Sequence, residues 1–291
     1  MEDMTMNRRS KGIKAVVLGV GLAAAAARAG FAGVPLNNLE GVGGIAFNPL
    51  AYTAGQPFGE GSEIGKYISK GQYGAWYVDL SQPNAVTHKT VDWTNISAAF
   101  TVLKRLELSY GFQDVNLNGA ANIHKSNIGA KAALITENQW GLNYIPAVSV
   151  GAIYKNTNYV ATNRNHSWDY YLVASKLVKQ TPLPVLVSAG ALSSQGVVTG
   201  VLGFDNQRDT TFFTNVDVLP LSNVALGYEF KRGASYSDWH DANYYDLHAA
   251  WFATANLTLV AAYVNAGKNT DTPTVGFGLG NGIVLSTQYA F

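Results

Sequence analysis

Hydrophobic and polar residues alternate with a period of two along most of this chain. Near its end, Ile283, Leu285 and Tyr289 fall on one face of an extended segment, while Ser286 and Gln288 fall on the other. Such alternation is typical of a β-strand whose two faces meet different surroundings. Twelve strands are predicted in this way, over 73–80, 93–102, 106–115, 127–135, 144–154, 168–177, 185–192, 211–218, 224–231, 243–252, 257–264 and 283–291.

The lengths of the strands and of their connections favour a membrane barrel. Most predicted strands have eight to eleven residues, and a tilted transmembrane strand needs about 9–11. Short connections, such as 103–105 and 253–256, alternate with long ones, such as 193–210 and 265–282. Outer-membrane barrels have short periplasmic turns and long extracellular loops. We therefore predict an all-β fold, a transmembrane antiparallel up-and-down β-barrel of about 12 strands, with 193–210 outside and Lys104 in the periplasm.

The composition agrees with this interpretation. Only 13% of the residues are charged, against about 25% in ordinary soluble proteins, yet the predicted mature chain has no run of the ~18 apolar residues that a spanning helix needs. Barrel strands are each half apolar, which explains a low charge without a helical span. A soluble β-sandwich would share the composition, but it gives no reason for connections sorted by length.

The N-terminus has the features of an export signal. Arg8, Arg9, Lys11 and Lys14 precede the apolar stretch 15–27, and small residues at Ala27 and Ala29 suit signal peptidase. We therefore divide the chain into a signal peptide over 1–29, a periplasmic or lumenal N-terminal segment over 30–70, and an outer-membrane barrel over 71–291. Within the middle part, 41–52 alternates poorly and contains Pro49, which disfavours a central strand. A plug in the lumen, a cap on the periplasmic mouth and a linker are all open for it.

Strand parity assigns side chains to the lipid or to the lumen. A basic residue on the lipid face near the bilayer midplane costs about 2–4 kcal/mol, so the parity that turns charges inward is preferred. The resulting candidates for lining a pore are Glu107, Lys131, Asp169, Asp217, Glu229, Lys231, Asp246 and His248. Acidic residues outnumber basic ones in this set, which predicts a mild cation preference. Aromatic residues near strand ends predict interfacial belts, and these are Trp93, Trp140, Trp168, Tyr244, Tyr245, Trp251 and Phe252.

Several segments resemble known proteins. An alternating strand that ends on Phe291 resembles the C-terminal signature of bacterial outer-membrane barrels. The other matching segments are Glu40 to Pro49 (EGVGGIAFNP), Leu106 to Ser109 (LELS), Lys131, and the run from Tyr244 to Phe252. Together they resemble an uncharacterised family of proteobacterial exported outer-membrane β-barrel proteins, a domain-of-unknown-function family. The resemblance implies the fold and an outer-membrane location, and it implies no substrate.

Catalysis and metal binding find little support in the sequence. An outer-membrane phospholipase needs a serine and a histidine on the lipid-facing side, whereas parity turns His248 inward. His88, His124, His166 and His240 fall in predicted loops, with no two at ligand spacing. We expect no enzyme, no metal and no cofactor. Loss of the signal peptide would leave 15 basic and 17 acidic residues, since five of the 20 and two of the 19 lie within it, and this balance argues against nucleic acid as a partner.

The number of strands sets the width of the lumen and so limits the functions to be expected. Eight strands enclose just enough room for side chains, and 16–18 strands leave a wide channel. A twelve-stranded barrel with a polar inner face is expected to be a narrow passive channel for small solutes or ions, embedded in outer-membrane lipid. The alternative is a closed structural or docking barrel that holds a partner protein in the outer membrane.

Overall fold

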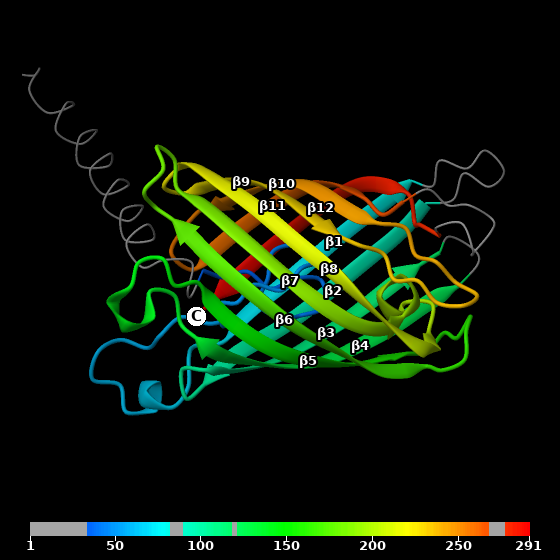
Figure 1. Ribbon diagram of the computed structural model, residues 1–291, viewed down its shortest axis with the longest axis horizontal. Coiled ribbons are helices and arrows are strands. Elements are labelled where there is room, and N and C mark those ends of the chain that lie inside the picture. The colour runs from blue at the N-terminus through cyan, green and yellow to red at the C-terminus, as the bar shows by residue number, and fades with distance from the viewer. Residues whose placement is uncertain (1–33, 82–89, 118–120, 268–276) are drawn as a thin grey trace, which may run out of the picture.

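The computed structural model describes residues 34–81, 90–117, 121–267 and 277–291, and the predicted signal peptide lies outside them. Twelve antiparallel strands form one closed barrel in which each strand pairs with its sequence neighbours and β1 pairs with β12 (Figure 1). The strands are β1 (Gln72–Ser81), β2 (Thr90–Val102), β3 (Leu106–Asn116), β4 (Asn122–Ile135), β5 (Ala147–Thr157), β6 (His166–Val178), β7 (Val185–Gly196), β8 (Phe204–Leu221), β9 (Val224–Lys231), β10 (Tyr244–Phe252), β11 (Leu257–Asn265) and β12 (Asn281–Ala290). The described residues also contain three short 3-10 helices. η1 (Ile64–Lys66) precedes β1, η2 (Gln139–Gly141) lies between β4 and β5, and η3 (Val197–Gly200) lies between β7 and β8.

The predicted fold class is confirmed, and all twelve predicted strands are present. Several strands are longer than predicted, because backbone pairing continues through polar residues that resemble loop sequence. The strand predicted over 211–218 runs from Phe204 to Leu221, and the one predicted from 127 begins at Asn122. Short connections at one end of the barrel and long ones at the other therefore alternate less regularly than expected. The β3–β4 connection covers only 117–121, whereas the β4–β5 connection on the other end covers 136–146.

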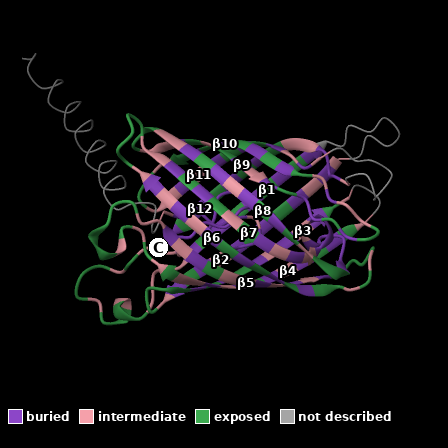
Figure 2. Ribbon diagram, viewed as in Figure 1, coloured by how far each residue is buried: buried purple, intermediate pink, exposed green. Residues whose placement is uncertain are grey.

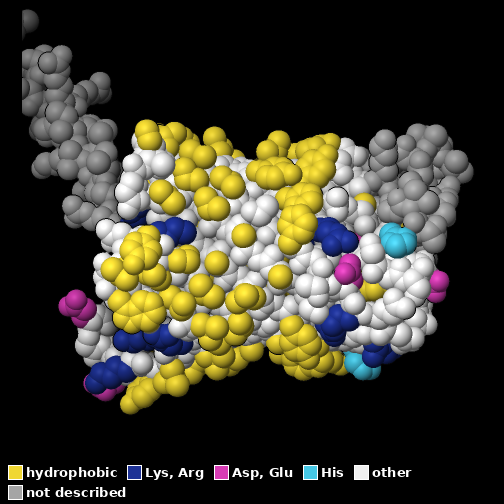
Figure 3. All heavy atoms as spheres, in the orientation of Figure 1, with side chains coloured by type: hydrophobic (Ala, Val, Ile, Leu, Met, Phe, Trp, Pro, Cys, Tyr) yellow, Lys and Arg dark blue, Asp and Glu magenta, His cyan; other side chains and the backbone are white. Residues whose placement is uncertain are grey.

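The outer wall is apolar. Side chains alternate between exposed and buried along each strand (Figure 2), and the exposed ones in mid-strand include Ile96, Leu247 and Leu285, with exposed fractions of 62%, 62% and 53%. Hydrophobic side chains spread over the face seen in Figure 3, and charged ones gather toward the two ends of the barrel. Such a belt is what the outer face of a transmembrane barrel requires. In the described part of the chain, no helix has the length and apolar character needed to cross a membrane.

The predicted aromatic belts need one correction. Trp93 and Tyr244 face the lumen and are only 5% and 7% exposed. Both lie on the inward parity of their strands, and parity decides the direction of a side chain regardless of its distance from the strand end. Trp140, Trp168 and Trp251 are exposed as expected, with exposed fractions of 70%, 45% and 50%.

Residues 34–54, which we call the lumenal segment, lie inside the barrel. This part of the chain runs behind the front strands in Figure 1, and 55–70 then cover the end that also carries the C-terminus. The segment folds on itself through hydrogen bonds from Leu39 N to Ala46 O (2.8 Å) and from Leu50 N to Gly43 O (3.0 Å). The Asn38 carboxamide oxygen accepts hydrogen bonds from the backbone N–H groups of residues 40 and 42, at 3.0 and 3.2 Å. The segment is therefore a compact structure and not an extended strand.

A second element enters the barrel from the opposite end. Residues 197–203 connect β7 to β8 and contain η3, and Val197, Val198 and Val201 have no exposed surface. Val198 and Thr199 have φ angles of 49° and 58°, which are unfavourable for β-branched residues. Hydrogen bonds from Val197 N to Gly203 O (3.0 Å) and from Val201 N to Val198 O (3.0 Å) hold this turn. Much of the predicted surface loop 193–210 is therefore strand or packed inside the barrel mouth.

The apolar wall predicts a depth-dependent effect of charge. Leu247 lies near the middle of β10, so Leu247→Arg should lower the free energy of unfolding by about 2–4 kcal/mol in lipid vesicles. The matched change at the end of β8, Leu221→Arg, should cost only about 0–1 kcal/mol. Urea titrations of both variants measure the difference. Equal costs at the two positions would contradict the assignment of the lipid face.

Candidate functional site

All eight predicted pore-lining side chains are buried on the inner face of the barrel. Their exposed fractions are 0% for Glu107, Lys131, Asp169, Glu229 and Asp246, 2% for Asp217, 5% for His248 and 7% for Lys231. Most of them contact the lumenal segment or one another, so the lumen they face is filled in this structure. Their role in lining an open pore stays a prediction.

The first contact that holds the lumenal segment is centred on Glu107. Glu107 and Lys131 are directly opposite on β3 and β4, and their charged groups are 2.8 Å apart. The Glu107 carboxylate also accepts hydrogen bonds from Gly43 N (2.8 Å) and Ala54 N (2.7 Å). Lys131 donates to Gly43 O (3.0 Å) and Leu50 O (3.2 Å). This one ion pair of the barrel wall thus binds backbone N–H and C=O groups at residues 43, 50 and 54 of the lumenal segment.

Residue 43 has to be glycine for this contact to form. A Cβ atom at Gly43 would lie 2.8 Å from the Glu107 carboxylate and 2.9 Å from the Lys131 ammonium. Both groups hydrogen-bond to the backbone of the segment, so moving them aside for a Cβ atom would disturb these bonds. The glycine therefore permits the backbone to approach the ion pair.

The second contact is on the opposite side of the lumen, at β8 and β9. The Glu229 carboxylate accepts hydrogen bonds from Ala46 N (3.1 Å) and Phe47 N (2.9 Å). Next to it, Asn48 donates from its amide group to Phe230 O (3.1 Å) and to Thr214 O (3.3 Å). The segment is therefore attached across the whole width of the barrel.

The third contact involves Glu40 and residues that the sequence analysis missed. Glu40 forms ion pairs with Lys155 and with Lys125, the latter at 3.4 Å, and Lys155 also pairs with Asp169 at 2.6 Å. Burial alone would raise the pKa of Glu40, but the ammonium groups of Lys155, Lys125 and Lys231 outweigh it and lower the pKa to about 2. Glu40 is therefore ionised at physiological pH.

Lys125 and Lys155 fell in predicted loops, because β4 begins earlier and β5 ends later than the sequence predicted. Both lie on the same inward parity as their neighbours, Lys125 with Lys131 in β4 and Lys155 with Ser149 in β5. Extension of the alternation by a few residues would have found them. With the two extra lysines, four inward lysines face five inward acidic residues of the predicted set, which reduces the acidic excess on which the predicted cation preference depended.

His248 forms a separate cluster with two aspartates. Its Nδ1 atom lies 2.7 Å from Asp246 Oδ1, and its Nε2 atom lies 2.7 Å from Asp217 Oδ1. A Cβ atom at Gly227 would be 2.3 Å from both His248 Nε2 and Asp217 Oδ1, so the glycine leaves room for this contact. Because a carboxylate occupies each ring nitrogen, His248 ties β8, β9 and β10 together and has no nitrogen free to act as a general base.

The remaining histidines also need a correction. His124 and His166 lie in β4 and β6, not in loops, since these strands begin earlier than predicted. His240 lies in the β9–β10 connection, and His88 is outside the described residues. Over the described ranges, no group of three or more His, Asp or Glu side chains is arranged to hold a metal ion.

The inward turn 197–203 is fastened by Asp241 of the β9–β10 connection. Asp241 accepts hydrogen bonds from Val198 N (2.9 Å) and from the Trp239 indole N–H (3.0 Å). Burial raises the pKa of Asp241 to about 7, although both hydrogen bonds and the nearby Lys231 act in the opposite direction. The folded connection therefore favours the protonated carboxyl up to about neutral pH.

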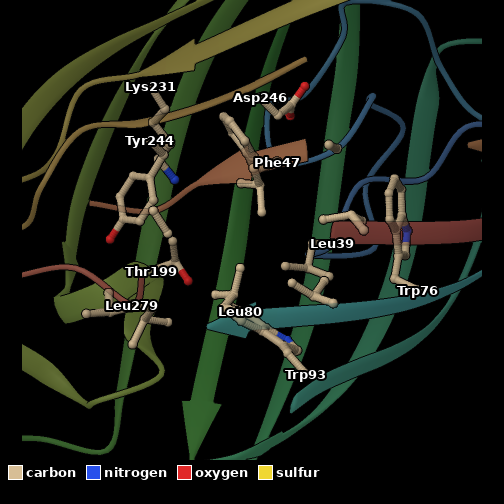
Figure 4. A pocket seen from close by; sticks show the side chains of 16 residues that line it. Leu39, Phe47, Trp76, Leu80, Trp93, Thr199, Lys231, Tyr244, Asp246 and Leu279 are labelled. Atoms are coloured by element: carbon tan, nitrogen blue, oxygen red, sulfur yellow. The ribbon is translucent and has the colours of Figure 1, made fainter. Parts of the chain in front are cut away.

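An apolar cavity lies between the two inserted elements and the wall. Its volume is about 70 Å³, and Figure 4 shows side chains of the lumenal segment, β1, β2 and the 197–203 turn around it. Its lining includes Phe47, Trp76, Trp93, Val198 and Lys231. The contacts of the lumenal segment at Glu107, Glu229 and Glu40 are polar or charged, whereas mainly hydrophobic side chains line this cavity.

The Glu107–Lys131 pair gives a test of the first contact. Lys131→Met should lower the free energy of unfolding by about 3–5 kcal/mol, because it leaves a buried carboxylate without its counter-charge. The double variant Glu107→Gln with Lys131→Met should lose less than Lys131→Met alone, since it buries no unpaired charge. Urea unfolding in vesicles compares the two. A double variant that is less stable than Lys131→Met would contradict the assignment.

The raised pKa of Asp241 predicts a pH dependence in the inward turn. An unfolded Asp has a pKa near 3.8 and the folded one is about 7, so the stability that the protonated group contributes is lost as pH rises between these values. Hydrogen exchange of the Val198 amide, corrected for its intrinsic pH dependence, should be about tenfold or more faster at pH 8 than at pH 5. Asp241→Asn should abolish this difference. A difference that persists in Asp241→Asn would assign it to another group.

The fold of this chain is similar to that of a solved porin structure. The KdgM porin structure superposes with a TM-score of 0.50 at 12% sequence identity, over 76% of this chain and 99% of that one. The NanC porin gives a TM-score of 0.48 at 11% identity, over 76% and 98% of the two chains, and Omp33 of Acinetobacter baumannii gives 0.45 at 12% identity, over 78% and 100%. At this level of identity the KdgM match shows the fold alone. No curated protein matches the sequence. A family model does match residues 33–275, and this chain belongs to that family, which is described as a protein of unknown function (DUF3034).

Proposed function

We propose that this protein is a passive outer-membrane channel for small solutes that its own lumenal segment holds closed. The observation that carries the proposal is the chemistry of the wall beneath the segment. Glu107, Lys131, Lys155, Glu229 and their neighbours are polar or charged and would be well hydrated if the segment withdrew. Outer-membrane barrels with a channel have such a polar interior.

The connectivity of the barrel also supports a removable segment. The wall closes through β1 and β12, whose pairing runs from Gln72 with Ala290 to Ser81 with Asn281. The lumenal segment contributes no strand to this closed sheet. It is held by ion pairs and hydrogen bonds, which water can replace, and also by apolar packing of Val42, Ile45 and Leu50, whose exposure to water would have to be offset on withdrawal. Its withdrawal would therefore leave the hydrogen-bonded wall intact.

The filled lumen favours a second candidate function. The lumenal segment and the 197–203 turn enter from opposite ends, which is also what a permanently closed structural barrel would show. Replacement of a buried ion pair by apolar residues is often neutral or stabilising, so a barrel that never opened would gain little from the charges that line this lumen. The lumenal charges therefore favour a channel over a permanently closed barrel, and recordings distinguish the two.

Single-channel recordings in planar bilayers test the channel directly, with the full-length mature chain. Val42→Cys with Gly129→Cys should fix the segment to β4, because a Cβ added at Gly129 would lie 2.8 Å from Val42 Cγ1. The Ser109 hydroxyl, which is the atom nearest to that Cβ, has to rotate away for the cysteine to fit. The native chain contains no cysteine, so this disulfide would be unique. We expect the oxidised double variant to be silent, and reduction to restore openings.

A second variant should act in the opposite direction. Glu40→Gln removes the carboxylate between Lys125 and Lys155, and like charges at short range should then loosen the segment. We expect a several-fold higher open probability than in the wild type. Val42→Cys alone and Gly129→Cys alone cannot form the disulfide, so they are the controls for the double variant. If the reduced double variant and Glu40→Gln are folded by heat modifiability but silent over many insertions, the channel is rejected and the closed structural barrel is accepted.

A further inference from the structure

The apolar cavity contains a buried cation without a partner. Lys231 lies on β9, borders the cavity and is 7% exposed. Within the described ranges its ammonium group has no hydrogen bond and no ion pair, whereas Lys125, Lys131 and Lys155 all pair with carboxylates. Glu40, Asp169 and Asp241 attract the Lys231 ammonium only from beyond ion-pair distance, and removal of a cation from water without a counter-charge in contact is costly. Lys231 is therefore a site that an anionic group would stabilise.

None of the nearby acidic groups among the described residues forms an ion pair with Lys231. Asp169 pairs with Lys155, and Asp241 accepts hydrogen bonds from Val198 N and the Trp239 indole. Glu40 lies between Lys125 and Lys155. Asp246 also borders the cavity. Its Oδ1 atom contacts His248, and its Oδ2 atom has no hydrogen-bond partner in the described part of the chain, but Figure 4 shows the carboxylate turned away from the middle of the cavity. The counter-ion for Lys231 is therefore not supplied by these carboxylates.

The rest of the cavity suits an aromatic ring. Trp76, Trp93 and Phe47 border it, together with aliphatic side chains of β1, β11 and β12 (Figure 4). Aromatic groups pack well against such side chains in offset or edge-to-face geometry. The indole N–H of Trp93 is buried and has no hydrogen-bond acceptor. Two side chains that line the cavity, Lys231 and Trp93, thus have a donor without an acceptor among the described residues. A ligand with acceptor atoms would satisfy both.

We propose that this cavity binds small aromatic carboxylates, with the carboxylate at Lys231 and the ring against Trp76, Trp93 and Phe47. The inference deepens the proposed function, because it names the class of solute that such a channel would admit. A charged acceptor at Lys231 forms the stronger kind of hydrogen bond, and the apolar body releases water from the indole and phenyl surfaces. A solute that is only charged or only apolar would satisfy half of the site.

The size of the cavity connects binding to opening. A volume of about 70 Å³ is smaller than the roughly 150 Å³ of an engineered cavity that takes up benzene. A ring can therefore enter only if a lining group moves. Phe47 belongs to the lumenal segment and Val198 to the inward turn, so both movable sides of the cavity are elements that close the lumen. Solute binding would thus draw on the same contacts that hold the barrel shut.

Equilibrium binding of benzoate to the full-length mature chain in detergent tests the inference, with tryptophan fluorescence or calorimetry as the readout. Two comparison solutes separate the parts of the site, since benzyl alcohol keeps the ring without the charge and acetate keeps the charge without the ring. We expect benzoate to bind at least tenfold more tightly than either. Equal affinity for acetate or for benzyl alcohol would overturn the proposal.

Substitutions locate the binding. Lys231→Met keeps the aliphatic stem and should weaken benzoate at least tenfold, while it changes benzyl alcohol less than twofold. Lys231→Arg should retain benzoate binding. Lys104→Met, in the exposed β2–β3 turn, is the matched control and should have no effect. Benzoate affinity that is indifferent to Lys231→Met in a folded barrel would contradict the assignment.

The outcome is separable from that of the channel. Benzoate binding that depends on Lys231, with silent recordings, would leave the binding site standing and remove the channel. Channel openings without measurable benzoate binding would leave the channel standing and remove this site.

Discussion

The structure depends on one constraint, which is that a chain inside a bilayer has to satisfy its backbone hydrogen bonds within itself. Twelve strands meet it by closing on themselves between β1 and β12. Closure then fixes the faces, because alternate side chains must point to lipid or to the lumen. Every charged side chain in mid-strand is driven inward by the cost of placing it in hydrocarbon. The concentration of acids and bases inside the barrel is therefore a consequence of the membrane.

Those inward charges in turn determine how the lumen is filled. An isolated charge in a narrow, low-dielectric interior is costly, so each one needs an opposite charge or several hydrogen-bond partners. The lumenal segment supplies such partners at three places. Its backbone amides satisfy Glu107 and Glu229, and its own Glu40 neutralises two lysines. The same groups could be satisfied by water, which makes the filled and the open lumen chemically alternative states.

The fold was predictable from the sequence because alternation is a local and repeated signal. Parity alone placed all eight candidate residues on the inner face, since a strand offers each side chain only two directions. Strand ends were less predictable, and Lys125 and Lys155 were missed for that reason. Trp93 and Tyr244 were misplaced because position near a strand end was given more weight than parity.

The organisation of the lumen was beyond what the sequence could predict. The segment from Glu40 to Pro49 has no periodicity, and its partners lie on strands far away in the chain, as with Glu229 and Phe47. Nothing local indicates that Gly43 meets an ion pair, or that residues 197–203 turn inward. Such contacts depend on the closed barrel bringing β3, β4 and β9 around one space. They are properties of the tertiary structure.

The central claim is that the lumenal segment is bound to the wall through its backbone, and amide hydrogen exchange in lipid measures this most directly. The amides of Gly43, Ala46, Phe47 and Ala54 donate to Glu107 or Glu229. They should be strongly protected and should lose protection together, because a single withdrawal of the segment exposes all four. Exchange as fast as that of the exposed residues at 59–61, or four unrelated rates, would contradict the account.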